Sequence, residues 1–345
     1  MKIAILADTH FGIRNDKQVF MNATEDFLRD TFFPYLKTNG IDTLIHLGDI
    51  FDKRKNLDVK TVETAKKCFF GVLRDRGIDT HILLGHHDIY YRNTNDINST
   101  EMLFRDTDFK IYKSPEIVEF DGTEIFMCPW INDENLDDVL SKISKTKSQI
   151  LMGHLELVGF NMDKFNVAKH GMDKKIFEKF DVVCSGHYHH KSTTGNINYL
   201  GSHMQFTWSD WGDERGFHVF DTDTRELTFI PNPVIMYHKL TDVEDELPDN
   251  LHENGFLRVM LNKKIDDATY SELIDTLSQK SLSDAKFIEN YDTSLITEDD
   301  EYTIDESEDT PVIISKYIDS LKTEIDKKHL KAVLSDLYKN AMDTT

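Results

Sequence analysis

Apolar residues in the first two hundred positions gather in short runs that each stop at a cluster of Gly, Asp or His. Five such runs occur: KIAILADTH (2–10), DTLIHLGDI (42–50), THILLGHHD (80–88), SQILMGHLE (148–156) and DVVCSGHYHH (181–190). Continuous apolar runs of this length predict strands that are buried on both faces. Residues 17–37 and 59–75 carry apolar residues at three- and four-residue spacing, which predicts helices. The polar clusters therefore fall at the carboxyl ends of strands, where ligands collect in α/β sheets.

The pattern becomes rich in β-structure after residue 109. FDG (120–122) and TDT (222–224) each separate two apolar runs and predict hairpins, and PNP (231–233) marks a boundary. Beyond this boundary we expect a small α/β cap, made of a strand at 256–261, a helix over 267–279 and a strand at 285–289.

The last part of the chain has a different composition. Residues 289–309 hold ten carboxylates and no Lys or Arg, which is typical of a linker. From Pro311 onward apolar residues recur at helical spacing, with a break near 327–329, and predict two amphipathic helices. We therefore expect four parts: a main domain (1–235), the cap (236–290), an acidic linker (291–309) and a helical tail (310–345).

Composition favours a globular protein of the cytoplasm. Hydrophobic residues make up 39% and aromatic residues 11% of the sequence, enough for a sizeable core. Cys68, Cys128 and Cys184 lie far apart and are odd in number, so they offer neither a disulfide framework nor a paired-cysteine zinc site. The apolar N-terminal run is too short for a signal peptide, and no later run is long enough to cross a membrane.

The net charge of −22 argues against nucleic-acid binding, which usually needs a basic surface. Nearly half of this excess lies in residues 289–309, and bound divalent cations would offset more of it where they bind. Net charge alone therefore does not exclude a nucleic-acid substrate.

The candidate chemistry lies at the ends of the five strand-like runs. Their polar residues are carboxylates and imidazoles, which suit a mixed nitrogen and oxygen site for Mn, Fe or Zn: Asp8, His10, Asp49, His86, His87, Asp88, His154, His187 and His189. Alternate residues of an extended segment point to the same side, so the D-x-H and H-x-H pairs can each converge on one ion. A single Gly-Asp or Gly-His is more often only a turn after a strand. Five motifs in the order DxH, GD, GxHD, GH and GHxH predict a metal site.

This order of motifs resembles that of the calcineurin-like metallophosphoesterases, over roughly residues 1–205. GDIFDKRK (48–55), NSTEML (98–103) and GHLELVGF (153–160) are similar to segments of the SbcD-type nuclease subunits, including those of tailed phages. The resemblance implies a four-layer α/β/β/α sandwich, followed by the small α/β cap and the helical tail.

The resemblance also implies two divalent metal ions, Mn²⁺ with Mg²⁺ as the alternative. It assigns seven ligands to them: to the first ion Asp8, His10 and His189, to the second His86, His154 and His187, and to both ions Asp49. Two ions about 3.5–4 Å apart can activate a water and stabilise both the attacking and the leaving oxygen. His87 would orient the scissile phosphate or protonate the leaving 3′ oxygen, and Asp88 would hold the His87 ring in the right tautomer.

One residue departs from the family pattern. The family has Asn where this chain has His86, so that GNHD becomes GHHD. A ring nitrogen on a bulkier side chain replaces a neutral carbonyl oxygen, and the ring can be protonated. We expect His86 to weaken metal binding and catalysis. The alternative is that imidazole is a competent ligand and changes only the metal preference.

Substrate contacts are predicted beside the metal site. Lys53, Arg54 and Lys55 follow the GD motif and are expected to contact phosphate, with a solvated basic turn as the alternative. Tyr91 and Arg92 follow the GxHD motif and are expected to stack on or hydrogen-bond with nucleic acid, although core packing would explain the tyrosine equally well. The three tryptophans are interpreted as core or domain-junction residues.

The activity that the resemblance implies is manganese-dependent hydrolysis of DNA, as a 3′→5′ exonuclease on duplex ends and an endonuclease on single strands or hairpins. It further implies roles in DNA repair and recombination, a homodimer, a cap that binds DNA, and an SbcC-type SMC-like ATPase bound by residues 310–345. Two other functions stay open. One is a small-molecule phosphodiesterase or phosphoprotein phosphatase on the same scaffold, and the other is a catalytically weakened scaffold that binds DNA and the ATPase.

Overall fold

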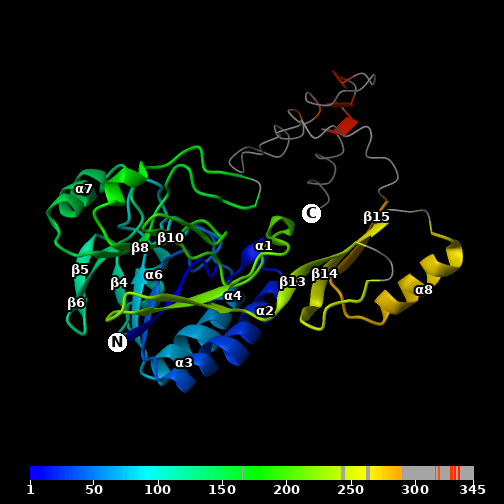
Figure 1. Ribbon diagram of the computed structural model, residues 1–345, viewed down its shortest axis with the longest axis horizontal. Coiled ribbons are helices and arrows are strands. Elements are labelled where there is room, and N and C mark those ends of the chain that lie inside the picture. Colours follow the sequence, from blue (N-terminus) through cyan, green and yellow to red (C-terminus); the bar gives the residue numbers. More distant parts are fainter. Residues whose placement is uncertain are drawn as a thin grey trace. The chain divides into compact units, whose positions relative to one another are not determined.

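Two six-stranded sheets form the centre of the main domain in the computed structural model (Figure 1). The structure describes residues 1–164, 166–241, 245–261 and 265–289, together with Ser315, Ile318, Lys327, Lys328, Leu330, Lys331, Val333 and Leu334.

The first sheet has the strand order β12-β11-β1-β2-β3-β4. Its strands are β1 (Lys2–Leu6), β2 (Thr43–His46), β3 (Asp79–Leu83), β4 (Lys110–Tyr112), β11 (Gly216–Asp221) and β12 (Leu227–Pro231). The second sheet has the order β5-β6-β7-β8-β10-β9. Its strands are β5 (Glu116–Phe120), β6 (Thr123–Cys128), β7 (Ile150–His154), β8 (Val182–Gly186), β9 (Ser192–Thr194) and β10 (Ile197–Tyr199). The five predicted apolar runs are confirmed as β1, β2, β3, β7 and β8, and both predicted hairpins are confirmed as the antiparallel pairs β5–β6 and β11–β12.

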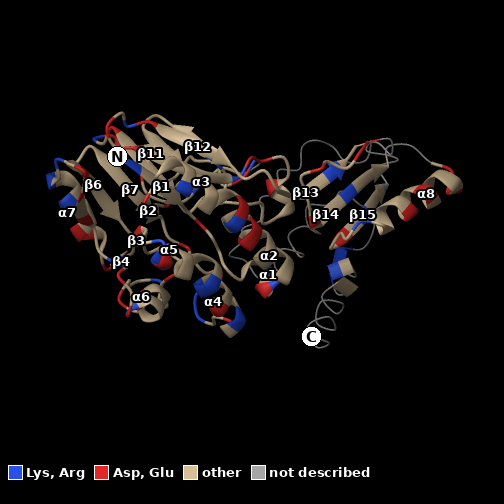
Figure 2. Cartoon of the chain, turned by 90° about the horizontal axis from the view of Figure 1, so that it is seen from below, with Lys and Arg blue, Asp and Glu red and all other residues tan. Residues whose placement is uncertain are grey.

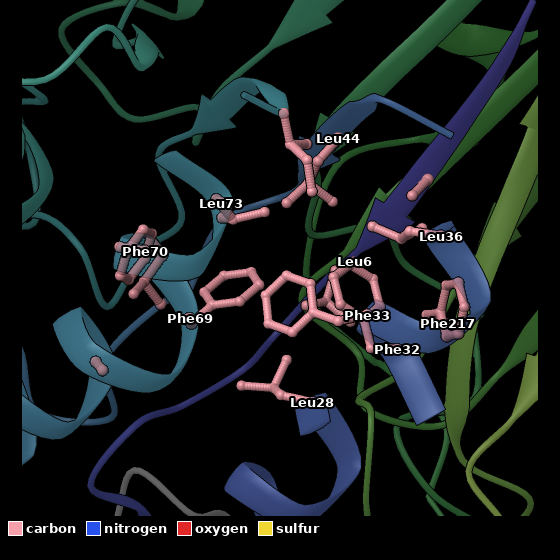
Figure 3. Packing of buried hydrophobic residues seen from close by; sticks show 14 of the residues in the cluster. Leu6, Leu28, Phe32, Phe33, Leu36, Leu44, Phe69, Phe70, Leu73 and Phe217 are labelled. Atoms are coloured by element: carbon pink, nitrogen blue, oxygen red, sulfur yellow. The ribbon is translucent and has the colours of Figure 1, made fainter. Parts of the chain in front are cut away.

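Three apolar layers hold the sheets and helices together. Between the sheets, Ile5 and Ile45 of the first pack with Met152 of the second. Helices on the outer face of the first sheet bury Phe32 and Phe69 against its strands (Figure 3). These helical segments are α2 (Gln18–Phe27), the π-helical η1 (Leu28–Phe32), α3 (Phe33–Asn39), α4 (Val59–Ala65), the π-helical η2 (Lys66–Phe70) and α5 (Gly71–Asp75). They occupy the ranges in which helical spacing predicted them.

The outer face of the second sheet is covered by α7 (Leu136–Lys145) and the 3₁₀ turn η3 (Lys174–Phe177). Helices, two sheets and helices thus form the four-layer α/β/β/α sandwich that was expected. Three short helical segments complete the main domain: α1 (Ile13–Asp16), α6 (Ser99–Phe104) and the 3₁₀ turn η4 (Trp208–Asp210).

A separate three-stranded parallel sheet follows, with β13 (Ile235–Leu240), β14 (Leu251–Leu261), α8 (Asp267–Ser278) and β15 (Asp284–Glu289). The predicted strand, helix and strand of the cap are all confirmed in it. On the far side of this sheet from α8, Phe256 stacks on Phe20 of α2. This contact joins the cap to the main domain.

The chain divides into two compact units, residues 1–289 and 290–345. The predicted acidic linker and tail helices fall in the second unit and lie outside the described residues, apart from the eight tail residues named above. Within the described part of the chain, no helix combines the length and the apolar character needed to cross a membrane.

Candidate metal centre

The carboxyl ends of five strands, three from the first sheet and two from the second, come together at one place. The structure brings all seven predicted ligands there in two groups, and the ligand atoms within each group lie within 4.8 Å of one another. The first group is Asp8, His10 and His189, and the second group is Asp49, His86, His154 and His187. The segments that follow β1, β2 and β3 supply four of the seven, and β7 and the segment after β8 supply three. The site therefore exists only when the two sheets are packed face to face.

Asp49 lies between the two groups. Its Oδ2 is 3.0 Å from His86 Nδ1 and 3.3 Å from His154 Nε2 in its own group, and 3.7 Å from His10 Nε2 in the other. This oxygen is fully buried and has no hydrogen-bond partner among the described residues. Because a buried carboxylate oxygen without a partner costs free energy, the position fits a bound cation.

The imidazole rings also approach one another closely. His10 Nε2 and His189 Nε2 are 3.0 Å apart, and His86 Nδ1 lies 3.3 Å from both His154 Nε2 and His187 Nδ1. A neutral imidazole binds a metal ion through the lone pair of one nitrogen. Ring nitrogens gathered around a buried carboxylate are therefore a donor set that fits divalent metal ions in both groups.

Burial sets the charge of these rings. It lowers the pKa of His10 and of His189 to about 3. It also lowers the pKa values of His86 and His187. Rings with lowered pKa values are neutral at neutral pH and keep a lone pair for a metal ion. Burial acts in the same direction on His154, but the Asp49 carboxylate outweighs it and raises the pKa of His154 to about 9. The field of Asp49 therefore favours positive charge at the centre of the site.

Four of the ligands have a backbone conformation that non-glycine residues rarely adopt. Their φ angles are positive: 51° at Asp8, 41° at His10, 55° at Asp49 and 92° at His187. Such conformations cost about 1–3 kcal/mol each and persist where the surrounding structure enforces them. Close approach adds a second constraint, because a Cβ atom at Gly85 would lie 2.1 Å from Asp49 Oδ1. The glycine that opens the GxHD motif is thus required for the two loops to meet.

His87 lies beside the first group. Its backbone N–H donates to Asp49 Oδ1 at 2.8 Å, its Nδ1 contacts the carbonyl oxygen of Asp52, and its ring centroid is 4.9 Å from that of His10. A carbonyl oxygen can only accept, so the proton of the neutral ring sits on Nδ1. Nε2 is then the ring nitrogen that can take or give a proton.

Asp88 has a different role from the one expected. The prediction that it holds the His87 ring is wrong, because its carboxylate accepts three backbone N–H groups instead: Asp49 at 2.8 Å, Ile50 at 3.0 Å and Gly85 at 2.8 Å. The side chain is fully buried at the base of the two loops. Asp88 thus fastens the loop after β2 to the loop after β3. The contact to the His87 ring that was expected of Asp88 is made by the Asp52 carbonyl oxygen instead.

The three basic residues after the GD motif differ in their surroundings. Lys53 forms an ion pair with Asp16, and Lys55 Nζ lies 5.3 Å from the ring centroid of Tyr90. Burial, followed by the nearby Arg92, lowers the pKa of Arg54. Within the described ranges neither Arg54 nor Lys55 forms an ion pair, so these two of the three carry a charge that no carboxylate offsets.

Tyr91 and Arg92 are both exposed, with 51% of the tyrosine accessible. Core packing is thereby excluded for Tyr91. The prediction that Tyr91 and Arg92 contact a substrate stays a prediction.

Sequence reasoning missed Trp130. Its ring centroid lies 5.1 Å from that of His86, 5.3 Å from that of His187 and 5.9 Å from that of His154, so it forms a wall of the second group. It follows β6, which is the neighbour of β7 in the second sheet. The signal that was available is the apolar run before CPW, which ends a strand as the five motif-bearing runs do.

Arg215 was also missed. It is buried, and its guanidinium donates to the carbonyl oxygen of His189, to Asp210 Oδ1 at 2.8 Å and to Asp213 Oδ2 at 3.1 Å. Arg215 therefore fixes the backbone that carries one of the predicted ligands. His203, by contrast, is buried against Thr24, at 3.1 Å between its Nε2 and the hydroxyl, and is not part of either ligand group.

Comparisons with known proteins agree with this geometry. Residues 1–191 match the family model described as calcineurin-like phosphoesterase. The chain is 31% identical over 345 residues to exonuclease subunit 1 of Enterobacteria phage T4, covering 99% of each chain. It is 23% identical over 288 residues to the SbcD subunit of the SbcCD nuclease of Staphylococcus epidermidis, covering 73% of this chain and 75% of the relative. Among solved structures, one of a novel archaeal phosphodiesterase covers 67% of this chain and all of its own, at 14% identity and a TM-score of 0.34, a likeness too low to carry an argument.

Proposed function

The chain belongs to the calcineurin-like phosphoesterase family, and on that premise we propose that it is a metal-dependent nuclease that hydrolyses DNA phosphodiesters. The observation that carries the proposal is the pair of buried ligand groups with Asp49 between them. The relatives named as an exonuclease subunit and a nuclease subunit support the choice of nucleic acid over a small molecule or a phosphoprotein. We further propose 3′→5′ exonuclease activity on duplex ends and endonuclease activity on single strands or hairpins, in DNA repair or recombination.

Two divalent ions would be held by the residues of the two groups, with Asp49 as the shared ligand. When bound, they would supply Lewis-acid stabilisation of the phosphate oxygens and lower the pKa of a bound water. The mixture of carboxylate and imidazole ligands suits Mn²⁺, which we propose as the ion, with Mg²⁺ as the alternative.

The chain's own residues would position the substrate and move a proton. His87 is held by its backbone N–H on Asp49 and by its ring on the Asp52 carbonyl, so its Nε2 has a fixed position beside the ligands. From there the ring, once Nε2 has taken up a proton, would donate a hydrogen bond to the scissile phosphate or pass that proton to the leaving 3′ oxygen. Asp88 would act as a positioning residue through the three backbone groups that it binds. Trp130 would keep bulk water from one side of the second group.

Further parts of the proposal concern partners. An SbcC-type SMC-like ATPase would bind residues 310–345, the cap would contact DNA, and Lys53, Arg54, Lys55, Tyr91 and Arg92 would contact the substrate near the ligands. A homodimer is also proposed. Its support is an apolar surface around a pocket of about 370 Å³, where Val59, Ile97 and Met102 are 84%, 53% and 65% exposed.

The test compares two substrates in Mn²⁺, a linear DNA duplex and a small chromogenic phosphodiester, for the wild-type chain and for Asp49→Ala. We expect cleavage of both substrates by the first and loss of both by the second, by a factor on the order of 10² or more, because the shared ligand is gone. Cleavage of the small diester alone would point to a small-molecule phosphodiesterase. DNA binding without cleavage of either substrate would point to a scaffold, and an active Asp49→Ala variant would contradict the two-ion assignment.

A further inference from the structure

A row of cations crosses the cap sheet from strand to strand. Lys239 of β13 pairs in register with Arg258 of β14, and Arg258 pairs with Lys286 of β15. Side chains that are paired across parallel strands project from the same face, and neighbouring strands lie about 4.8 Å apart. Figure 2 shows blue ribbon segments on these strands. We call Lys239, Arg258 and Lys286 the cationic row. Like charges directly opposite one another destabilise a sheet, so the row is unfavourable for stability alone and is more readily explained by a function.

The row lies on the face of the sheet that α8 does not cover. Alternate residues of β14, namely Leu257, Val259 and Leu261, are buried in the apolar cluster that includes Leu277 of α8. Arg258 lies between these positions in the strand and points to the opposite face. On that face Phe256 packs against the main domain, and the cationic row follows one rung further along the strands.

Tryptophans of the main domain hold two members of the row in place. The Arg258 guanidinium lies 4.1 Å from the ring centroid of Trp208, and Lys239 Nζ lies 4.1 Å from that of Trp211. Lys164 Nζ lies 5.8 Å from the same Trp211 ring, but its charge is offset by an ion pair with Asp213 Oδ1 at 3.2 Å. Cation–π contacts of this kind order the side chains without neutralising them.

The charges in the middle of the row are not compensated. Across the described ranges neither Lys239 nor Arg258 forms an ion pair with a carboxylate, and Arg258 Nε is buried without a hydrogen-bond acceptor. Burial, followed by Arg258 and Lys164, lowers the pKa of Lys239, which reflects this crowding of like charge. Lys286 is 66% exposed and lies 3.4 Å from Asp284, a surface pair that compensates little. Lys239 and Arg258, which have no carboxylate partner in the described part of the chain, and the weakly paired Lys286 lie within a Debye length of about 8–10 Å, so together they form a binding surface for several linked negative charges.

A short loop joins this surface to the metal centre. The ring of Phe206 lies 5.7 Å from that of His10 and 5.4 Å from that of His189, and Trp208 is two residues further along the chain. The segment that carries Trp208, and through it Arg258, is therefore the same one that packs against two of the predicted ligands.

We propose that the cationic row binds consecutive phosphates of the DNA strand on its way to or from the metal centre. The proposal rests on the proposed nuclease function, and it answers the objection raised by the net charge of −22, because the basic surface that DNA needs is concentrated on one face of the cap. The tryptophans order the cations before the strand arrives, which reduces the entropy lost on binding.

The test is a double variant, Lys239→Met with Arg258→Met, which keeps the apolar stems on the tryptophan rings and removes two charges. The matched control is Lys280→Met, an exposed lysine just after α8 that is outside the row. Binding of a labelled single strand and of a labelled duplex is measured in EDTA over a series of salt concentrations, so that no strand is cut. We expect Kd to rise about tenfold for the double variant and the slope of log Kd against log salt to fall by about 1.4–1.8, since each lost phosphate contact removes about 0.7–0.9. Weaker binding of the double variant to the single strand, to the duplex or to both supports the proposal and identifies the form of DNA that the row binds.

A Kd and a salt slope equal to those of Lys280→Met for both forms would overturn the proposal. Hydrolysis of the small chromogenic diester in Mn²⁺ reports whether the fold and the metal centre are intact in the double variant. If that activity is lost, Lys286→Met, at an exposed position, decides instead, with an expected loss of one phosphate contact in the salt slope. Wild-type chain that binds DNA but cuts nothing would refute the nuclease and leave the row supported. Wild-type chain that cuts DNA while both variants bind as the control does would refute the row alone.

Discussion

At the residue scale, His86 stands where the resemblance to the family leads us to expect Asn. Its Nδ1 lies 3.0 Å from Asp49 Oδ2, so the ring reaches the second ligand group. The ring can be protonated, but burial lowers the pKa of His86 and so favours its neutral form. What differs from Asn is the donor atom, a nitrogen in place of a carbonyl oxygen, and Mn²⁺ prefers oxygen.

We therefore predict that His86→Asn raises both the Mn²⁺ content and the Mn²⁺-dependent cleavage rate. The gain should lie between a few-fold and the order of 10²-fold that small misplacements of reacting groups can cost. Metal analysis of the purified variant and its rate on duplex DNA check this. A variant that binds no more Mn²⁺ and is no faster would show that histidine is a competent ligand here.

A second prediction at this scale concerns Asp88. Asp88→Asn replaces one acceptor oxygen by an NH₂ group that must face a backbone N–H, so a buried donor loses its partner. We expect a loss of about 2–3 kcal/mol in the free energy of unfolding and weaker metal binding, since charge-assisted hydrogen bonds of this kind are strong. Urea denaturation and metal titration measure the two effects. Unchanged metal affinity would mean that Asp88 does not position the ligand loops.

At the element scale, strands and helices of the main domain were predictable because each carries its own pattern. Apolar runs gave β1 and β7, and the motif at the end of each run placed its ligands at a strand terminus. The contacts of Asp88 and Trp130 could not be predicted in this way. These contacts depend on which loops become neighbours: the loop after β2 lies beside the loop after β3, and the loop after β6 lies beside β7. The order of strands in a sheet cannot be read from the pattern of any single strand.

β11 allows a test of pH dependence. His218 is 4% exposed in this strand, and burial, with a contribution from Lys191, lowers its pKa to about 3. The unfolded chain takes up a proton near pH 6.5 and the folded chain does not, so His218 costs stability as pH falls from 6.5 toward 3, by about 1.4 kcal/mol per pH unit. Above pH 6.5 it has no such effect.

The free energy of unfolding should fall less steeply between pH 6.5 and pH 5 in His218→Gln than in the wild-type chain. We expect the difference in slope to be about 1.4 kcal/mol per pH unit, the value for one proton. Urea denaturation at a series of pH values measures it, with His170→Gln at an exposed position as the control. Parallel curves for His218→Gln and the wild-type chain would contradict a buried neutral His218.

At the scale of the whole molecule, the main domain and the cap together hold the proposed chemistry, while the proposed partner contact lies in residues 310–345. Removing these residues should abolish association with the proposed ATPase and leave hydrolysis of the small diester unchanged, because all seven predicted ligands lie within residues 1–289. A pull-down with the ATPase and the diester assay on the same preparation check both halves. Undiminished pull-down by the truncated chain would exclude the tail as the binding segment.

The centre takes four ligands from one sheet and three from the other, so ions bound there cross-link the two halves of the sandwich. A cross-link ties the melting of one sheet to the melting of the other, as binding to the native state always adds to its stability. The loaded chain should show one calorimetric transition, and a chelator should lower Tm and broaden or split that transition. Asp49→Ala should show the broadened transition even without a chelator. The atoms proposed to cut DNA would then also decide whether this protein unfolds as one body or as two.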